Sequence, residues 1–137
     1  LNHLSNIDAI TKTIERVSLF AELNGLFIFD VNTPFKHKNI LANNTFIYDT
    51  DEVYCIWQNA YYDKDNRVII NLDFFEKDGA VYHRSEESFS EIAYSQKQFD
   101  EILINSGFEI LAHYDYDTFN CPNDFSEKII FVVRKVR

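Results

Sequence analysis

Two almost continuous apolar runs enclose a long stretch of alternating residues, and this change of pattern constrains the fold more than any other feature. The first run is Leu26–Val31, and the second fills all but the first position of Lys128–Val133. Runs of this kind are typical of strands covered on both faces, as in a parallel sheet flanked by helices. Residues 45 to 92 alternate between apolar and polar instead, which is typical of antiparallel strands with one solvated face. The sequence therefore predicts an α/β chain that contains an inserted antiparallel β-meander.

An amphipathic helix is predicted before the first apolar run. Residues 6 to 23 carry isoleucine, valine and phenylalanine at spacings of three and four, which places them on one face. We expect Ser5 to cap the start of this helix. Asn24 and Gly25 supply the left-handed stop, so that the strand follows the helix at once.

The α/β pattern resumes after the alternating stretch. The segment Ser95–Gln98 has the Ser-x-x-Gln form of a capping box, and Gly107 ends the helix that it begins. The interpretation is a core of residues 1–34 and 94–137 with an inserted subdomain of residues 35–93. We expect the strand Leu26–Val31 to lie beside Phe108–Tyr114 or Lys128–Val133 in one sheet, with residues 45 to 92 forming a separate antiparallel layer.

Charge and cysteine content narrow the classes of function. The net charge is -9, from 22 acidic and 13 basic residues, and an acidic surface repels phosphate backbones. No apolar segment approaches the roughly 20 residues that a membrane-spanning helix needs. The two cysteines, Cys55 and Cys121, are isolated, and the four histidines lack metal-ligand spacing. We therefore expect a cytoplasmic protein without a metal site, and neither nucleic acid nor membrane as a partner.

The glycine content argues against a complete nucleotide-binding domain. Only Gly25, Gly79 and Gly107 are present, each isolated, so that no glycine-rich phosphate loop can be formed from them. The chain also begins with Leu1 and contains no methionine. These observations lead to the expectation that the chain is a fragment or a processed piece of a longer protein.

The order of the predicted elements resembles a known family. A helix followed by Gly25–Pro34, and later a helix followed by Gly107-Phe108, a strand, a loop and a last strand, resembles the second half of a class I S-adenosylmethionine-dependent methyltransferase. The closer resemblance is to small bacterial members with an antiparallel insert after the fifth strand. It is carried by the segments 41–46, 54–57 and 91–94 and extends over essentially the whole chain.

This resemblance implies a cofactor and a reaction. The fold would be the carboxy-terminal portion of a Rossmann-like sheet, the cofactor S-adenosylmethionine, and the acceptor a small or medium-sized molecule. The segment containing Asn2 and His3 is similar to the one beside the methionine end of the cofactor. Where relatives carry Glu-x-His, this chain has Glu87-Ser88-Phe89, so that a histidine able to touch substrate is replaced by Phe89. No catalytic residue is assigned.

Candidate substrate-binding residues come from the chain itself. Asp30, Asn32 and Thr33 end the first apolar strand, where open α/β sheets place their ligands, although the same residues are also ordinary turn formers. Tyr54 and Trp57 could line an apolar acceptor pocket, or form cross-strand pairs within the insert.

Two alternatives follow from these patterns. The first is a methyltransferase fragment that lacks its glycine-rich cofactor loop, and that is inactive alone. The second is a stand-alone α+β module that binds a partner and performs no chemistry. A half-sheet would expose the edge of Leu26–Val31 or Lys128–Val133. We therefore expect either a homo-oligomer or a missing amino-terminal half to cover it.

Overall fold

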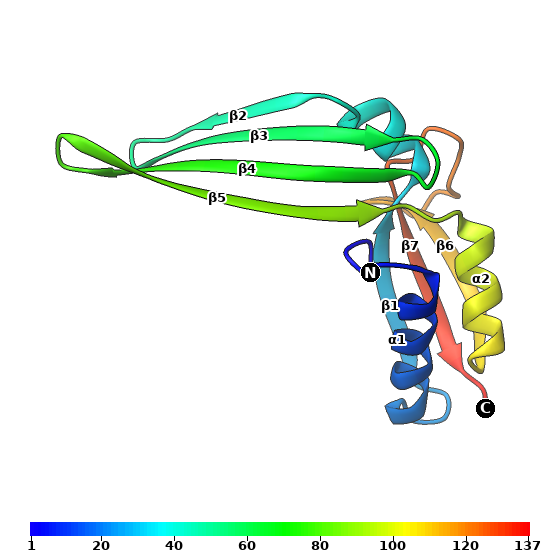
Figure 1. Cartoon of the computed structure of the whole chain (residues 1–137). Helices are drawn as coiled ribbons and strands as arrows, with labels where there is room; N and C mark the ends of the chain where they lie inside the picture. Colours follow the sequence, from blue (N-terminus) through cyan, green and yellow to red (C-terminus); the bar gives the residue numbers. More distant parts are fainter.

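The computed structural model describes all 137 residues as two arms that meet at a corner (Figure 1). One arm holds both α-helices and a three-stranded sheet, and the other is a long four-stranded sheet. None of the helices has the length and apolar character needed to cross a membrane. The elements in chain order are α1 (Ile7–Phe20), β1 (Leu26–Asn32), the short π-helix η1 (Lys36–Leu41), β2 (Thr45–Asp49), β3 (Val53–Tyr62), β4 (Arg67–Asp78), β5 (Val81–Ile92), α2 (Gln96–Asn105), β6 (Phe108–Asp115) and β7 (Lys128–Lys135).

The three-stranded sheet has the order β1-β7-β6, and both pairings are antiparallel. The predicted pairing of the two apolar runs is confirmed, since Phe29 lies opposite Phe131. Both helices pack on the same face, where Ile14 of α1 and Phe99 of α2 join Phe131 in one buried cluster. This α/β core matches the predicted fold class.

The prediction that β1 is covered on both faces is wrong. Only one face of the sheet carries helices, and on the opposite face Leu26 and Ile28 are 61% and 59% exposed. The parallel arrangement is also wrong, because β1 runs antiparallel to its one neighbour, β7. A continuous apolar run shows that a strand carries apolar side chains on both of its faces. It does not show whether other parts of the same chain cover both faces.

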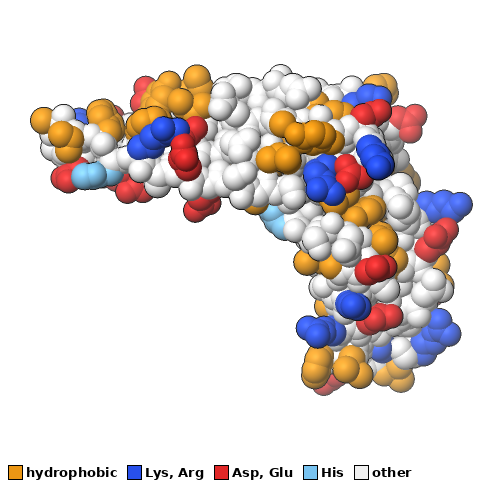
Figure 2. Space-filling view, viewed as in Figure 1, with side chains coloured by type: hydrophobic (Ala, Val, Ile, Leu, Met, Phe, Trp, Pro, Cys, Tyr) orange, Lys and Arg blue, Asp and Glu red, His pale blue; other side chains and the backbone are white.

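The alternating residues form the meander β2-β3-β4-β5, in which each strand pairs antiparallel with the next. Its buried part lies at the corner, where Val68 and Ile70 of β4 pack with Leu41 of η1. Farther out the sheet is thin, and Val81 and Tyr82 are 56% and 59% exposed there. Figure 2 shows apolar side chains on the surface of this outer part. The predicted separate antiparallel layer is therefore confirmed.

Asn2 fastens the corner between the two arms. Its amide nitrogen donates to the carbonyl oxygens of Asn32 (3.2 Å) and Ile92 (3.1 Å), the last residues of β1 and β5. Its amide oxygen accepts from the backbone nitrogen of Asn32 at 2.9 Å, and its carbonyl accepts from the nitrogen of Ile92 at 2.9 Å. The first residues of the chain thus hold the ends of two strands together.

Candidate functional site

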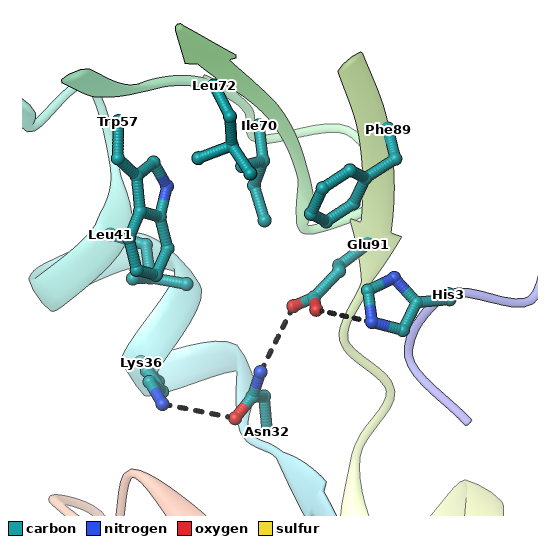
Figure 3. A pocket seen from close by; sticks show the side chains of 9 residues that line it. All are labelled: His3, Asn32, Lys36, Leu41, Trp57, Ile70, Leu72, Phe89 and Glu91. Atoms are coloured by element: carbon teal, nitrogen blue, oxygen red, sulfur yellow. Dashed lines mark hydrogen bonds and ion pairs between the residues drawn. The ribbon is translucent and has the colours of Figure 1, made fainter. Parts of the chain in front are cut away.

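A pocket of about 250 Å³ opens at the corner, between the end of β1 and the inner face of the long sheet (Figure 3). We call it the corner pocket. Its walls come from the chain start, β1, η1, β3, β4 and β5, so that both arms are needed to form it. The lining residues are His3, Asn32, Lys36, Leu41, Trp57, Ile70, Leu72, Phe89 and Glu91.

One wall of the corner pocket is apolar. Figure 3 shows Trp57 and Phe89 on opposite sides, with Leu72 and Ile70 between them. The Trp57 indole is held in place because its nitrogen donates to the side-chain oxygen of Asn59 at 2.6 Å, and its ring lies 5.2 Å from that of Phe46. A rigid aromatic ring of this kind favours a ligand with an apolar or planar body.

The facing wall is polar, and its groups are joined in a row. Glu91 accepts a hydrogen bond from the Asn32 amide (3.0 Å) and pairs with the imidazole of His3 (3.1 Å). The Asn32 amide oxygen in turn accepts from Lys36 Nζ at 3.2 Å. The row therefore has a carboxylate at one end and an amine at the other, with the Asn32 amide fixed between them (Figure 3).

The protein environment shifts the pKa of both charged ends of this row. Burial alone would raise the pKa of Glu91, but contact with His37, the charge of His3 and the amide of Asn32 together lower it below the ordinary value. Burial lowers the pKa of Lys36, and the charge of Lys128 adds to this effect. The pocket thus holds an ionised carboxylate beside an amine that loses its proton more readily than usual.

His37 lies behind Glu91, outside the pocket lining, and its side chain is fully buried. Its Nδ1 is 2.6 Å from the carbonyl oxygen of Asn66, and its Nε2 is 3.6 Å from Glu91 Oε2. The Nε2 atom has no hydrogen-bond partner, because 3.6 Å exceeds the length of a hydrogen bond. An imidazole nitrogen buried without a partner is uncommon and calls for an explanation.

The structure brings three of the predicted site residues into the corner pocket, namely His3, Asn32 and Trp57. His3 also packs against Phe89, with ring centroids 5.3 Å apart. Asn2 lies next to the pocket, but its amide is occupied by the hydrogen bonds of the corner. A cofactor contact for His3 or Asn2 stays a prediction.

Three other predicted residues lie elsewhere. Asp30 points to the open side of β1, where its carboxylate is 3.9 Å from Lys128 Nζ. The Thr33 hydroxyl is buried and donates to the carbonyl oxygen of Ser126 at 2.6 Å, which ties the end of β1 to a loop. Tyr54 lies toward the outer part of the long sheet, in edge contact with Phe75. The structure thus does not bring Asp30, Thr33 and Tyr54 into the corner pocket, and gives Thr33 a structural role.

Sequence reasoning did not assign Glu91, Lys36 or His37 to the site. One signal for Glu91 was available, since it is in phase with Phe89 on an alternating strand, opposite the apolar Val68. A carboxylate on the buried face of a strand is uncommon unless it is paired. Lys36 and His37 lie in an irregular segment whose π-helical turn no sequence pattern indicated.

Comparisons with known proteins agree with this fold. No family model matches the chain. The chain is 26% identical over 135 residues to a Bacillus subtilis (strain 168) protein named "Putative methyltransferase YqeM", covering 98% of this chain and 55% of that protein. A crystal structure of an S-adenosylmethionine-dependent methyltransferase from Clostridium acetobutylicum ATCC 824 is 32% identical, with a TM-score of 0.89, over 99% of this chain and 55% of that one.

A more distant structure shows the same fold. CalS10, a methyltransferase from Micromonospora echinaspora solved with S-adenosylmethionine bound, is 11% identical with a TM-score of 0.71, over 98% of this chain and 54% of that one. The chain spans about half the length of each of the relatives that it matches.

Proposed function

We propose that this chain, which matches the carboxy-terminal part of class I S-adenosylmethionine-dependent methyltransferases in sequence and fold, forms the acceptor-binding portion of such an enzyme. The observation that carries the proposal is the corner pocket, which opens where β1 ends beneath the inserted sheet. Open α/β sheets bind ligands outside the carboxyl ends of their strands. The proposed acceptor is a small or medium-sized molecule held between Trp57 and Phe89.

These 137 residues do not fit the cofactor by themselves. No glycine-rich turn precedes a helix in the chain, and the Asn2 amide is already used at the corner. We therefore assign the main cofactor contacts to a part of the enzyme outside this chain. Bound S-adenosylmethionine carries a methyl group on a positively charged sulfur and needs little further activation, so that the protein mainly aligns donor and acceptor.

In that alignment, the residues of this chain would hold and orient the methyl acceptor. The apolar wall excludes water, and the row Lys36-Asn32-Glu91 orients polar groups of the acceptor. Because Asn2 fixes Asn32 to the end of β5, the row keeps its position relative to the end of β1. The domain interpretation, with residues 35–93 as an insert that covers the acceptor, belongs to the same proposal.

Calorimetry on two proteins tests the proposal: the complete reading frame that encodes this chain, and the 137-residue chain alone. We expect the reading frame to bind S-adenosylmethionine with micromolar affinity, and the chain to bind it at least about a hundredfold more weakly, because most polar anchors of the cofactor are absent. Methyl transfer to a panel of small acceptors is expected only for the reading frame. Low-micromolar binding by the chain, or no binding by the reading frame, contradicts the proposal.

A further inference from the structure

We propose that Glu91 and His37 together form a proton-accepting pair, and that the acceptor in the corner pocket is an alkylammonium compound with an apolar or aromatic body. This inference rests on the proposed function and deepens it by naming the chemical class of the acceptor. The observation behind it is the arrangement of two buried titratable groups with room for one proton between them.

The backbone settles which nitrogen of His37 donates. A carbonyl oxygen only accepts hydrogen bonds, so the Nδ1 atom, 2.6 Å from the Asn66 carbonyl, carries a hydrogen. In a neutral imidazole the Nε2 atom then has a lone pair, and this lone pair faces Glu91 Oε2 at 3.6 Å. At that distance no hydrogen bond forms, and the Nε2 lone pair is left without a donor. One added proton on Nε2 would supply the missing hydrogen bond to Glu91.

Glu91 connects this buried position with the pocket. Its side chain is 11% exposed, and it lines the corner pocket while its Oε2 atom faces His37. The other polar groups against it are His3 and the amide of Asn32. Both keep the carboxylate ionised, so that a cationic group of a ligand is attracted to it.

The apolar surface of the corner pocket limits the size and polarity of the part of the ligand that does not contact Glu91. Trp57 and Phe89 present aromatic faces on opposite sides, and Ile70 and Leu72 close the space between them. A cavity of about 250 Å³ admits a compact apolar group but little more. An ammonium group beside Glu91, on a short chain that carries an apolar body, satisfies both walls.

The proton balance explains why an ammonium compound needs this pair. A protonated amine has no lone pair on nitrogen, so it cannot accept a methyl group until an N–H bond breaks. In the proposed step the Glu91 carboxylate holds the ammonium and relays its proton to Nε2 of His37, which keeps the proton as an imidazolium paired with the ionised Glu91, and the electron pair of the broken N–H bond stays on the amine nitrogen. The positive charge of the ammonium is thereby moved to the Glu91–His37 pair, and no other co-reactant is required.

Nuclear magnetic resonance on the 137-residue chain tests this step without methyl transfer. The probes are phenethylamine and its neutral counterpart 2-phenylethanol, near pH 8, where an alkylammonium with a pKa like that of lysine, about 10.4, is still protonated. The single tryptophan gives one indole N–H resonance, which reports occupancy of the pocket. The ¹⁵N shift of His37 Nε2 reports whether that atom gains a proton.

We expect phenethylamine to bind about tenfold more tightly than 2-phenylethanol, because hydrogen bonds to a charged group are roughly twice as strong as neutral ones. The amine, but not the alcohol, should move His37 Nε2 to the protonated shift. The variant Glu91→Gln should abolish the preference, while Glu87→Gln, an exposed glutamate on the same strand, should leave it unchanged.

The other outcomes are distinct. Equal affinity for the two probes, or tighter amine binding without protonation of Nε2, overturns the proton-accepting pair while the pocket remains the proposed acceptor site. If neither probe moves the Trp57 resonance at millimolar concentration, the acceptor pocket itself is refuted, and the proposed function fails with it.

Discussion

Glu91 is the residue on which the chemistry of the corner pocket depends, and sequence reasoning did not find it. The alternation of β5 could place Glu91 on the inner face, but the partners that stabilise its charge come from distant segments. His3 belongs to the chain start, Asn32 to β1 and His37 to η1. The place of Trp57 in the pocket wall, by contrast, could be predicted from the sequence. A large aromatic side chain on an alternating strand usually lies in a core or lines a pocket.

The stability of the fold should depend on pH through Glu91. Because the folded state holds its pKa below the ordinary 4.5, the ionised carboxylate stabilises the fold above pH 4.5, and this contribution is lost as pH falls through the folded pKa. Urea unfolding at a series of pH values between about 7 and 3 measures the effect.

The variant Glu91→Gln isolates this contribution from that of other carboxylates. The free energy of unfolding of Glu91→Gln should fall less steeply between pH 5 and 3 than that of the parent chain. Glu87→Gln is the matched control and should follow the parent curve, since its side chain is exposed. Equal slopes for Glu91→Gln and the parent would contradict the expected role of Glu91.

At the scale of elements, local sequence patterns predicted more of the structure than they did for the single residues of the corner pocket. The predicted stop of the first helix at Asn24 and Gly25 is wrong, because α1 ends at Phe20 with an extended cap at Ala21, and Asn24 at φ 66° belongs to the turn before β1. By contrast, the capping box at Ser95 is present, with its hydroxyl accepting from the backbone nitrogen of Gln98, and Gly107 after α2 has the left-handed φ of 92°. These features succeed because they depend only on neighbours in sequence. The π-helical turn η1 depends on the packing of Leu41 against β4, which local reasoning does not see.

The start of α1 differs from the prediction by one residue. Asn6, not Ser5, is the cap, because its side-chain oxygen accepts from the backbone nitrogen of Ala9 at 2.9 Å. Both residue types are good caps, so that sequence preference alone did not separate them.

Paired alanine variants measure this difference. Asn6→Ala should lower the free energy of unfolding by about 0.5–2 kcal/mol, whereas Ser5→Ala should change it by less than about 0.5 kcal/mol. Thermal or urea unfolding of the two variants beside the parent chain gives both values. A larger loss for Ser5→Ala would show that the cap in solution lies one residue earlier.

At the scale of the whole molecule, the open face of the three-stranded sheet should govern association. β1 has β7 on one edge and no strand on the other, and Leu26 and Ile28 are exposed on the same sheet. Since β7 lies between β1 and β6, the free edges of this sheet belong to β1 and β6 and not to Lys128–Val133. Unpaired edges and apolar patches drive pairing with another chain.

We therefore expect the 137-residue chain to associate at about tens of micromolar, as measured by light scattering. A variant with both Leu26→Glu and Ile28→Glu should be monomeric, because two charges on the open face oppose burial. Val81→Glu, at the far end of the long sheet, is the control and should associate as the parent does. A parent chain that is monomeric at this concentration would remove the basis for the oligomer expectation.

The long sheet also gives the molecule the geometry of a lever. β4 has 12 residues, which at about 3.3 Å per residue makes an arm of roughly 40 Å, and Leu72 of the corner pocket lies about 16 Å along this arm from the corner. Turning the arm by about 3° about the corner would carry its tip through some ~2 Å and Leu72 through less than half of that distance. Small movements that a ligand causes at Trp57 or Phe89 are therefore magnified at the tip, and a spectroscopic label placed near Gly79 would report them with the greatest amplitude.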